Sequence, residues 1–327
     1  MSLDADLIVD RRRMRRKLTF WRVATVLVAV GAVVGGALVL TGNRAALTGG
    51  PGGSIARVTI EGLIRASRQR VEALDRLAQS NAKAVIVHLN SPGGTVAGSE
   101  QLYDSLMRVK AKKPMVVVVD GLAASGGYIA AMASDRIVAQ QSAIVGSIGV
   151  IFQYPNVTEL LKTIGVQVET IKSSPLKAAP SGYEPTSPEA RAAVEAIVKD
   201  SYAWFRGLVG ERRHLDPALL ERVSDGRVFT GRQALELKLI DSLGDEQAAI
   251  DWLAKEKNID PKTPVRDYRL NPRLGDLPFL HVAMAGLLDA VGLNSLALQL
   301  KEWGAVQAVE RLNLDGLLAL WHPPSTN

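Results

Sequence analysis

The sequence predicts an α/β fold built around a largely parallel sheet. Short apolar runs alternate with amphipathic stretches of helical length along residues 54–260. Two of the apolar runs end in glycine-rich turns, as strands do when they lead directly into helices. Strands that alternate with helices pair in parallel, because each helix carries the chain back across the sheet. With 47% hydrophobic and 22% charged residues, the chain has the composition of a folded protein.

The expected elements follow this alternation in order. The expected strands are short apolar runs at residues 57–60, 84–89, 115–119, 136–139 and 166–171. The expected helices repeat apolar side chains at helical spacing and cover residues 67–80, 96–110, 126–133 and 156–163. A further helix begins at Ser187 and Pro188, an N-cap followed by a proline in the first turn, and extends to about residue 213. Three prolines in residues 172–186 predict a loop before it.

The N-terminal region predicts a single membrane anchor. Residues 23–40 contain no charged side chain, and a helix of this length rises about 27 Å, close to the thickness of the hydrocarbon core. Residues 1–22 contain seven Lys or Arg, which places them in the cytoplasm by the positive-inside rule. We therefore expect a basic cytoplasmic segment at 1–22, a transmembrane helix at 23–41 and a glycine-rich tether at 42–53. A cleaved signal peptide is the alternative.

Charge and cysteine content exclude several classes of function. The formal net charge is +6, but the basic tract before the apolar run supplies most of the excess. A basic surface on the folded domain, as nucleic-acid binding requires, is therefore not predicted. Without cysteine, the chain has no disulfide scaffold, no thiol nucleophile and no zinc–thiolate site.

The C-terminal region, residues 261–327, is expected to be a linker followed by an amphipathic extension. Prolines mark residues 261–277, and apolar periodicity returns in residues 277–320. This extension could pack on the domain, contact the membrane or bind a neighbouring subunit.

Two glycine-rich turns are the candidate functional elements. Residues 90–94 (NSPGG) follow one expected strand, and residues 123–128 (AASGGY) follow the next. Glycine lets backbone N–H groups converge without side-chain clashes, and converging N–H groups can stabilise an oxyanion. The second turn also presents Ser125 at the start of a helix of small residues, which predicts a nucleophile. The alternative is that the glycines only relieve crowding where strands turn into helices.

A serine nucleophile needs a base, and the four histidines are poorly placed to provide one. His88 lies within an expected strand, His214 lies at a charged helix end, and the other two lie in the C-terminal extension. None has the spacing of a metal ligand. Lysine is the remaining choice, and a lysine acts as a base when burial lowers its pKa. Lys177 is the candidate because its neighbours are small and apolar, and Lys172 is the rival.

Five sequence blocks occur in order between residues 54 and 253: LNSPGG, DGLAASGGYIAAMASDRIVA, VGSIGVIFQ, IKSSPLKAA and GRVFTGRQALELKLIDSLG. With these blocks the sequence resembles the signal peptide peptidase A family of membrane-anchored Ser/Lys proteases. The resemblance implies a Clp protease/crotonase-like α/β fold, in which repeated ββα units form a superhelix. This peptidase domain would cover residues 54–260 and would be preceded by the single N-terminal transmembrane helix.

The resemblance gives roles to three side chains. Ser125 in ASGG matches the family's nucleophile, and Lys177 in the IKSSPLK block matches its general base. Ser147 in GSIG matches a serine that orients this lysine, although the same residues are also typical of a turn before a strand. The apolar neighbours of Lys177 depart from the family pattern, which has a glycine and a polar residue near the lysine.

The resemblance also implies an acyl-transfer mechanism without metal or cofactor. The N–H groups of Gly93 and Gly126 match the oxyanion hole, with Gly94 as the alternative to Gly93. The lysine would take a proton from Ser125, and the alkoxide would attack a peptide carbonyl held by these N–H groups.

Finally, the resemblance implies an assembly and a location. SPGG and ASGG each occur once, as in the short form of the family, whose members form ring or dome homo-oligomers with sites shared between adjacent subunits. The expected substrates are remnant signal peptides and other unfolded translocated peptides. The expected location is the cytoplasmic (inner) membrane, with the catalytic domain on the extracytoplasmic side. Two alternatives remain at this point, a crotonase-like enzyme of thioester chemistry and a non-catalytic membrane scaffold.

Overall fold

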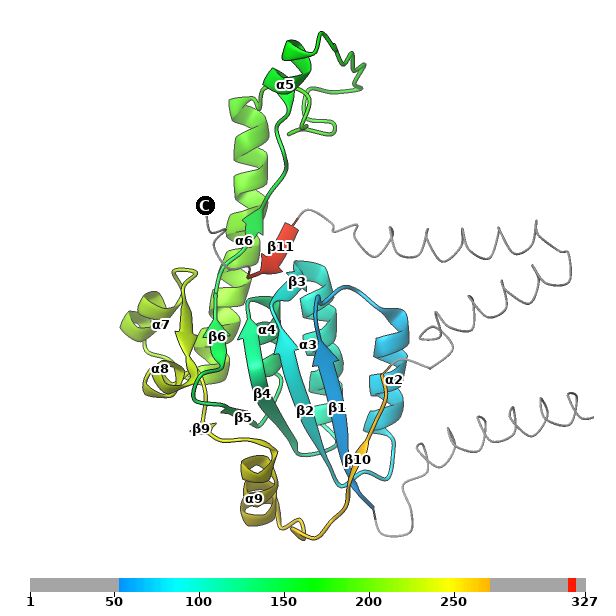
Figure 1. Cartoon of the computed structure of the whole chain (residues 1–327), viewed down its shortest axis with the longest axis vertical. Helices are drawn as coiled ribbons and strands as arrows, with labels where there is room; N and C mark the ends of the chain where they lie inside the picture. Colours follow the sequence, from blue (N-terminus) through cyan, green and yellow to red (C-terminus); the bar gives the residue numbers. More distant parts are fainter. Residues whose placement is uncertain (1–52, 271–316, 322–327) are drawn as a thin grey trace, which may run out of the picture. The chain divides into compact units, whose positions relative to one another are not determined.

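The computed structural model describes residues 53–270 and 317–321 (Figure 1). The predicted basic segment, the transmembrane helix and most of the C-terminal extension lie outside the described residues. Within the described ranges, no helix is both long enough and apolar enough to cross a membrane.

The main sheet is largely parallel, as predicted. Its central path has the order β10-β1-β2-β4-β5-β9, and every pairing along this path is parallel. These strands are β1 (Ile55–Glu61), β2 (Ala84–Ser91), β4 (Met115–Ala124), β5 (Arg136–Ala139), β9 (Ser242–Leu243) and β10 (Val265–Asp267). The last part of β4 pairs in parallel with β6 (Ile144–Gly146), which pairs antiparallel with β8 (Val228–Thr230). The sheet thus continues past residue 260 into β10.

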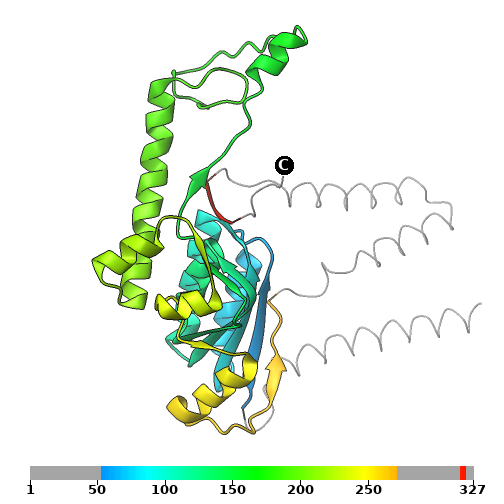
Figure 2. The same cartoon turned by 60° about the vertical axis from the view of Figure 1, so that its left-hand side comes forward.

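Helices cover both faces of this sheet (Figures 1 and 2). Alternate residues of β2 divide between two apolar clusters, because successive side chains of a strand point to opposite faces. One face packs against α2 (Arg68–Ala78), α3 (Val96–Lys110), α4 (Gly126–Ala131) and the C-terminal half of α6 (Pro188–Arg213). The other face packs against α9 (Glu246–Lys257). Two shorter helices, α7 (Pro217–Val223) and α8 (Gly231–Glu236), lie beside β8 and the end of α6.

A second, smaller sheet lies next to the glycine-rich turns. It consists of β3 (Gly93–Thr95), β11 (Leu317–Leu320) and β7 (Ile151–Phe152), in the order β3-β11-β7. Both pairings of β11 are antiparallel. The middle strand of this sheet therefore comes from the C-terminal region of the chain.

Most predicted elements are confirmed, and two differ. The helices at 96–110 and 188–213 and the strand at 136–139 have the expected bounds. Strand β4 extends five residues beyond the predicted end at 119, because its last part pairs with β6. The prediction of a strand at 166–171 was wrong: the segment has no strand beside it, and the side chains of Val166, Val168 and Ile171 are exposed. Apolar alternation alone cannot form a strand without a partner edge.

Residues 153–187 form an arm between β7 and α6. The arm contains α5 (Thr158–Thr163), which has no buried residue, and the predicted loop at 172–186. Both views show α5 and the chain that follows it near the N-terminal end of α6 and apart from the main sheet (Figures 1 and 2).

Candidate active site

Ser125 lies at the turn between β4 and α4 in a strained backbone conformation. Its φ is 53° and its ψ is −118°, a region that residues other than glycine rarely adopt. Two hydrogen bonds hold it there: its N–H donates to the Gly146 carbonyl (2.8 Å), and its carbonyl accepts from the Ile129 N–H (3.0 Å). The residue is 1% exposed, and its Oγ makes no hydrogen bond to the described residues. Strain of about 1–3 kcal/mol at such a residue is typical of functional sites.

Ser147 lies beside Ser125 at the ends of two parallel strands. Ala124 of β4 pairs with Gly146 of β6, so the two serines directly follow a paired position. Ser147 also has a positive φ, 52°, and is 9% exposed. Its N–H donates to the Arg227 carbonyl (2.8 Å), which holds the backbone while leaving the hydroxyl unused among the described residues. The structure therefore brings together two predicted site residues that are 22 positions apart in the sequence.

The NSPGG turn contacts the Ser125 turn through close backbone packing. A Cβ atom at Gly127 would lie 2.6 Å from the Ser91 carbonyl oxygen, so the helix that follows Ser125 can approach the first turn only with glycine there. A Cβ atom at Gly94 would lie 1.8 Å from the Ile64 carbonyl oxygen. Gly127 thus allows α4 to approach the NSPGG turn, and Gly94 allows β3 to approach the backbone of Ile64.

The three predicted oxyanion-hole residues differ in how their N–H groups are used. The Gly93 N–H donates to Ser91 Oγ (3.1 Å), and Ser91 Oγ donates to the Gly62 carbonyl (2.6 Å). Gly94 pairs with Ala319 of β11. Gly126 is the first residue of α4, where the N–H has no partner within the helix. Gly126 is therefore the candidate donor whose amide the described chain leaves open.

The lysines of the arm differ in their partners. Lys172 forms an ion pair with Glu184, which lowers the pKa of that carboxyl group. Lys177 is exposed, and although its backbone N–H donates to the Ser174 carbonyl, its side-chain amine forms no hydrogen bond or ion pair with the described residues. Lys172 is therefore committed to a carboxylate, whereas the amine of Lys177 is available. Within one chain, the structure does not bring Lys177 into contact with Ser125.

His88 is held in an ionic network on the α9 face of the sheet. Its Nδ1 lies 2.9 Å from Asp120 Oδ2, and its Nε2 lies 2.7 Å from Glu246 Oε2. Arg57 also hydrogen bonds to Glu246, and this contact is the main cause of the lowered pKa of Glu246. Both ring nitrogens are thus occupied, which agrees with the prediction that His88 is poorly placed to act as the base for Ser125.

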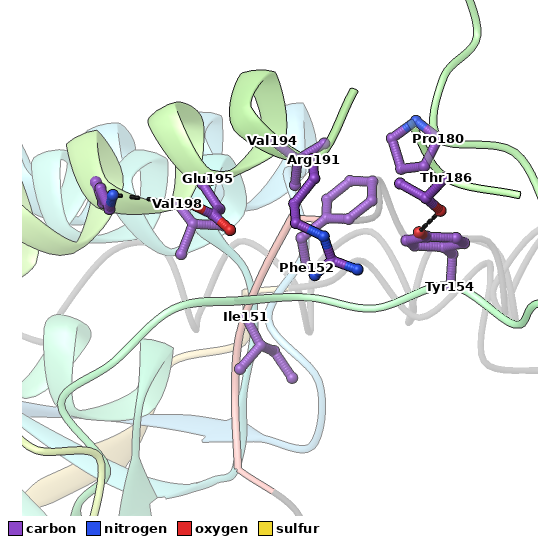
Figure 3. Close-up of a pocket in the computed structure, with 10 residues that line it drawn as sticks. Ile151, Phe152, Tyr154, Pro180, Thr186, Arg191, Val194, Glu195 and Val198 are labelled. Atoms are coloured by element: carbon purple, nitrogen blue, oxygen red, sulfur yellow. Dashed lines mark hydrogen bonds and ion pairs between the residues drawn. The ribbon is translucent and has the colours of Figure 1, made fainter. Parts of the chain in front are cut away.

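A cavity of about 340 Å³ lies between β7, the arm and α6 (Figure 3). Its wall is mostly apolar, with Ile151 and Phe152 of β7 on one side and Val194 and Val198 of α6 on the other. Tyr154 and Thr186 hydrogen bond to each other at its end within the arm. Because β7 also pairs with β11, the cavity adjoins the small sheet at the site.

A buried serine on a strained strand-to-helix turn, next to glycine amides from two turns, defines the site of a serine hydrolase. Comparisons with known proteins agree. The pattern of Peptidase family S49 matches residues 107–260, and that of Clp protease matches residues 64–147.

Three relatives are similar to this chain over more than half of its length. A protein of Synechocystis sp. named "Putative protease slr0021" is 37% identical over 209 residues, which cover 63% of this chain and 76% of the relative. The "Putative signal peptide peptidase SppA" of Enterococcus faecium is 34% identical over 56% of this chain and 54% of its own. The "Serine protease SPPA, chloroplastic" of Arabidopsis thaliana is 32% identical over 64% of this chain and 32% of its own.

This chain belongs to peptidase family S49, the signal peptide peptidase A family. It is a serine peptidase with a Clp protease-like α/β fold. The predicted family resemblance is confirmed.

Sequence reasoning missed two features of the site. Ser91 supports the first glycine turn by bonding to Gly62 and to the Gly93 N–H, and its place in the NSPGG block was the available signal. Strand β11 was missed because LLALW is too short and too distant in the sequence to indicate a strand beside the glycines.

Proposed function

We propose that this chain is a membrane-anchored serine endopeptidase that uses Ser125 and Lys177 as a catalytic dyad. The observation that carries the proposal is the conformation of Ser125, which is buried, strained and free of hydrogen bonds from its Oγ to the described residues. A fold retains such strain where it presents a reactive group. The neighbouring Ser147 also has a hydroxyl without a hydrogen bond to the described residues, and in the proposed dyad this hydroxyl orients the lysine amine.

In the proposed mechanism, neutral Lys177 takes the proton from Ser125 as the Oγ attacks a peptide carbonyl carbon. The developing oxyanion accepts hydrogen bonds from the Gly126 N–H and from the N–H of Gly93 or Gly94. Lys177 then protonates the leaving amine and later removes a proton from the water that hydrolyses the acyl-enzyme. No metal or cofactor takes part in these steps.

We further propose that an adjacent subunit supplies the lysine. The arm exposes several large apolar side chains, which in a soluble domain mark an interaction surface; they are Leu160, Ile164, Val166, Val168, Ile171, Leu176 and Tyr183. Docking of this arm on a second copy would cover these side chains and bring Lys177 to the turn at Ser125. Removal of the amine from water favours its neutral form, which the mechanism requires.

The proposed substrates are remnant signal peptides and other unfolded peptides at the extracytoplasmic face of the cytoplasmic (inner) membrane. The apolar run at residues 23–41 would anchor the domain there, with the basic residues before it in the cytoplasm. A ring or dome of subunits over the membrane would admit extended peptides and exclude folded proteins.

A fluorophosphonate probe tests the dyad directly, because it labels only an activated serine. We expect labelling of the wild type to rise with pH, to be lost in Ser125→Ala and to fall strongly in Lys177→Ala. Lys172→Ala is the matched control, because this lysine lies in the same arm but is paired with Glu184. A Lys177→Ala variant with an unchanged rate and pH profile would refute the assignment of the base.

A further inference from the structure

Basic side chains gather at the edge of the main sheet where its parallel strands begin. The strands along the central path of the sheet are all parallel, so they start at one edge and end at the opposite edge. The four connections that lead into β2, β4, β5 and β10 contain nine Lys or Arg and three Asp or Glu. These connections, named the basic edge below, are residues 79–83, 108–114, 132–136 and 254–264.

The opposite edge, where Ser125 lies, has the reverse charge. The segments at the ends of β1, β2, β4, β5 and β9 contain one Arg and four Asp or Glu. These segments are residues 61–67, 90–96, 120–126, 140–143 and 243–246. The small net charge of the domain hides this asymmetry, because opposite charges lie at opposite edges. The domain is therefore electrically polarised along its strands.

Five lysines of the basic edge are exposed, and their amines form no hydrogen bond or ion pair with a described residue. They are Lys83, Lys112, Lys255, Lys257 and Lys262. A helix C-terminus favours nearby cations, which accounts for Lys255 and Lys257 in the last turn of α9. The other three lie outside the helices. All five ammonium groups can therefore meet an external anion.

A tryptophan lies among these charges. The half-buried Trp252 of α9 has the guanidinium of Arg136 5.8 Å and the amine of Lys257 5.5 Å from its ring centroid. Tryptophan flanked by basic side chains is typical of surfaces that meet the headgroup region of a membrane, where the ring is partly apolar and the cations bind phosphate.

Repulsion between cations is already present at this edge. Burial, and next the charge of Arg212, lowers the pKa of Lys110, and the charge of Lys257 adds to the effect. Asp135 offsets part of it, with Oδ1 3.6 Å from Lys110 Nζ. An anion bound beside these cations would relieve the remaining repulsion.

The chain also enters the domain at the basic edge. The Lys83 N–H donates to the Ser54 carbonyl (2.9 Å), and the Ile55 N–H donates to the Pro264 carbonyl (3.0 Å), so β1 begins between two of the basic connections. The predicted tether before it covers residues 42–53, and a flexible glycine-rich chain of this length spans about 20 Å. With the apolar run in a bilayer, the basic edge would stay within reach of the headgroups.

We propose that the basic edge docks on anionic phospholipid headgroups, so that the sheet stands on the membrane with the Ser125 turn at its far end. The nearness of the lipid rests on the proposed membrane anchor, whereas the binding rests on the lysines. Each lysine near an anionic surface strengthens binding by about fivefold, and the tether makes docking intramolecular. Strand β4 has ten residues, a length of about 33 Å, so an extended peptide must leave the headgroups by about this distance to reach Ser125.

The test uses the full chain reconstituted in vesicles of phosphatidylcholine, with and without phosphatidylglycerol. The sequence contains no cysteine, so single cysteines can carry a fluorescent dye. Asn81→Cys places the dye on the basic edge, and Gln69→Cys in the first turn of α2 places it on the opposite edge. A quencher attached to lipid headgroups should quench the Asn81→Cys dye in phosphatidylglycerol vesicles only. The Gln69→Cys dye should stay bright in both kinds of vesicle.

Charge removal measures the contribution of the lysines. In the Asn81→Cys chain, Lys112→Gln with Lys262→Gln should lower the ratio of docked to undocked molecules by about 25-fold. Arg68→Gln with Arg232→Gln is the matched control, because it removes two exposed charges at helix starts on the opposite edge and should leave docking unchanged. About 0.5 M sodium chloride, which shortens the Debye length to roughly 4 Å, should also undock the wild type.

The outcomes separate docking from anchoring and from catalysis. Equal quenching of the Asn81→Cys dye in the two kinds of vesicle, or equal loss in the two double variants, would overturn the docking. Equal quenching of both dyes would overturn the orientation. A chain that floats with phosphatidylglycerol vesicles only at low salt would lack the anchor and still dock, whereas one that floats with neither would overturn both. Fluorophosphonate labelling of Ser125 should be the same in both double variants, and its absence from every chain would refute the nucleophile while leaving the docking in place.

Discussion

The turn at Ser125 and the arm that carries Lys177 contrast in almost every physical respect. Ser125 is buried, lies at the end of a central strand and is fixed by backbone hydrogen bonds to Gly146 and Ile129. The arm contains a short helix without a buried residue and exposes large apolar side chains. The proposed nucleophile and its proposed amide donors thus come from the packed, rigid part of one chain.

This contrast explains how a site can be preorganised and still depend on assembly. The strain at Ser125 is sustained by a packed sheet, so it does not require a neighbour. The amine of Lys177 has no partner among the described residues and gains one only if the arm docks on another surface. Substitutions of Ser125 and Lys177 test whether the turn at Ser125 and the arm together form one site.

The largest effect is expected from Ser125→Ala. Loss of the nucleophile should lower kcat for peptide cleavage by about 10³–10⁶-fold, while the melting temperature stays near that of the wild type. Ser134→Ala is the control, because Ser134 is also a buried serine but lies three residues after the end of α4, where its hydroxyl donates to the Ala131 carbonyl. Peptide cleavage assays and thermal unfolding check both variants. Near-normal activity in Ser125→Ala would rule this serine out as the nucleophile.

The second prediction concerns the origin of the lysine. Ser125→Ala and Lys177→Ala should each be inactive alone, but an equal mixture, after subunit exchange, should recover roughly a quarter of wild-type activity, because one site in four then combines an intact serine with an intact neighbouring lysine. A mixture of two preparations of Ser125→Ala, treated in the same way, provides the baseline activity. A mixture that stays inactive after confirmed exchange would mean that serine and lysine come from the same chain.

The two regions also differ in how well the sequence alone predicts them. The strand β5 and the amphipathic helices α3 and α6 were predicted with correct bounds, and β1, β2 and β4 were predicted in the right places but too short. Ser187 is the expected N-cap and accepts a hydrogen bond from the Ala190 N–H. Ser125 was predicted as the candidate nucleophile because its turn combines glycines with the start of a helix of small residues.

The conformation of residues 166–171 in the arm and the position of β11 could not be predicted from local patterns. Residues 166–171 alternate like a strand, but a strand needs a partner edge, and no local pattern reports whether one exists. Likewise, the place of β11 depends on pairing with β3 across more than 200 positions of sequence. Long-range pairing and contacts between subunits leave no periodic signal within the segment itself.

The packed strands and turns around Ser125 should also lose the most stability when a residue in them is substituted. In Gly94→Ala, the added methyl group would overlap the Ile64 carbonyl, so β3 must shift, and we expect a loss of about 2–3 kcal/mol in the free energy of unfolding. Gly207→Ala in α6 is the control, because a Cβ there meets no atom within 4 Å and alanine favours the helix by about 0.5–1 kcal/mol. Denaturant unfolding measures both. A Gly94→Ala chain as stable as the wild type would show that this turn is more adaptable than its packing indicates.

The smallest effect on stability is expected on the face of the sheet that packs against α9, where Glu246 binds Arg57 and His88. The hydrogen bond from Arg57, and after it that from His88, lowers the pKa of Glu246 below its ordinary value. A carboxyl group with a lowered folded-state pKa stabilises the fold above its unfolded pKa, near 4.3, and this contribution is lost as the pH falls through the folded value.

Glu246→Gln should therefore lower the free energy of unfolding by about 1 kcal/mol at pH 7, since solvent partly screens the pair. The difference from the wild type should shrink below about pH 4, where the wild-type carboxyl group becomes protonated. Glu256→Gln on the same helix is the control: Glu256 is exposed and lies at the C-terminal end, where a negative charge is unfavourable, so its loss should not destabilise the protein. Denaturant unfolding between pH 3 and pH 7 checks both variants. A Glu246→Gln penalty that is constant across this range would show that the side chain acts through packing rather than charge, and the α9 face would then be as insensitive to pH as the apolar core.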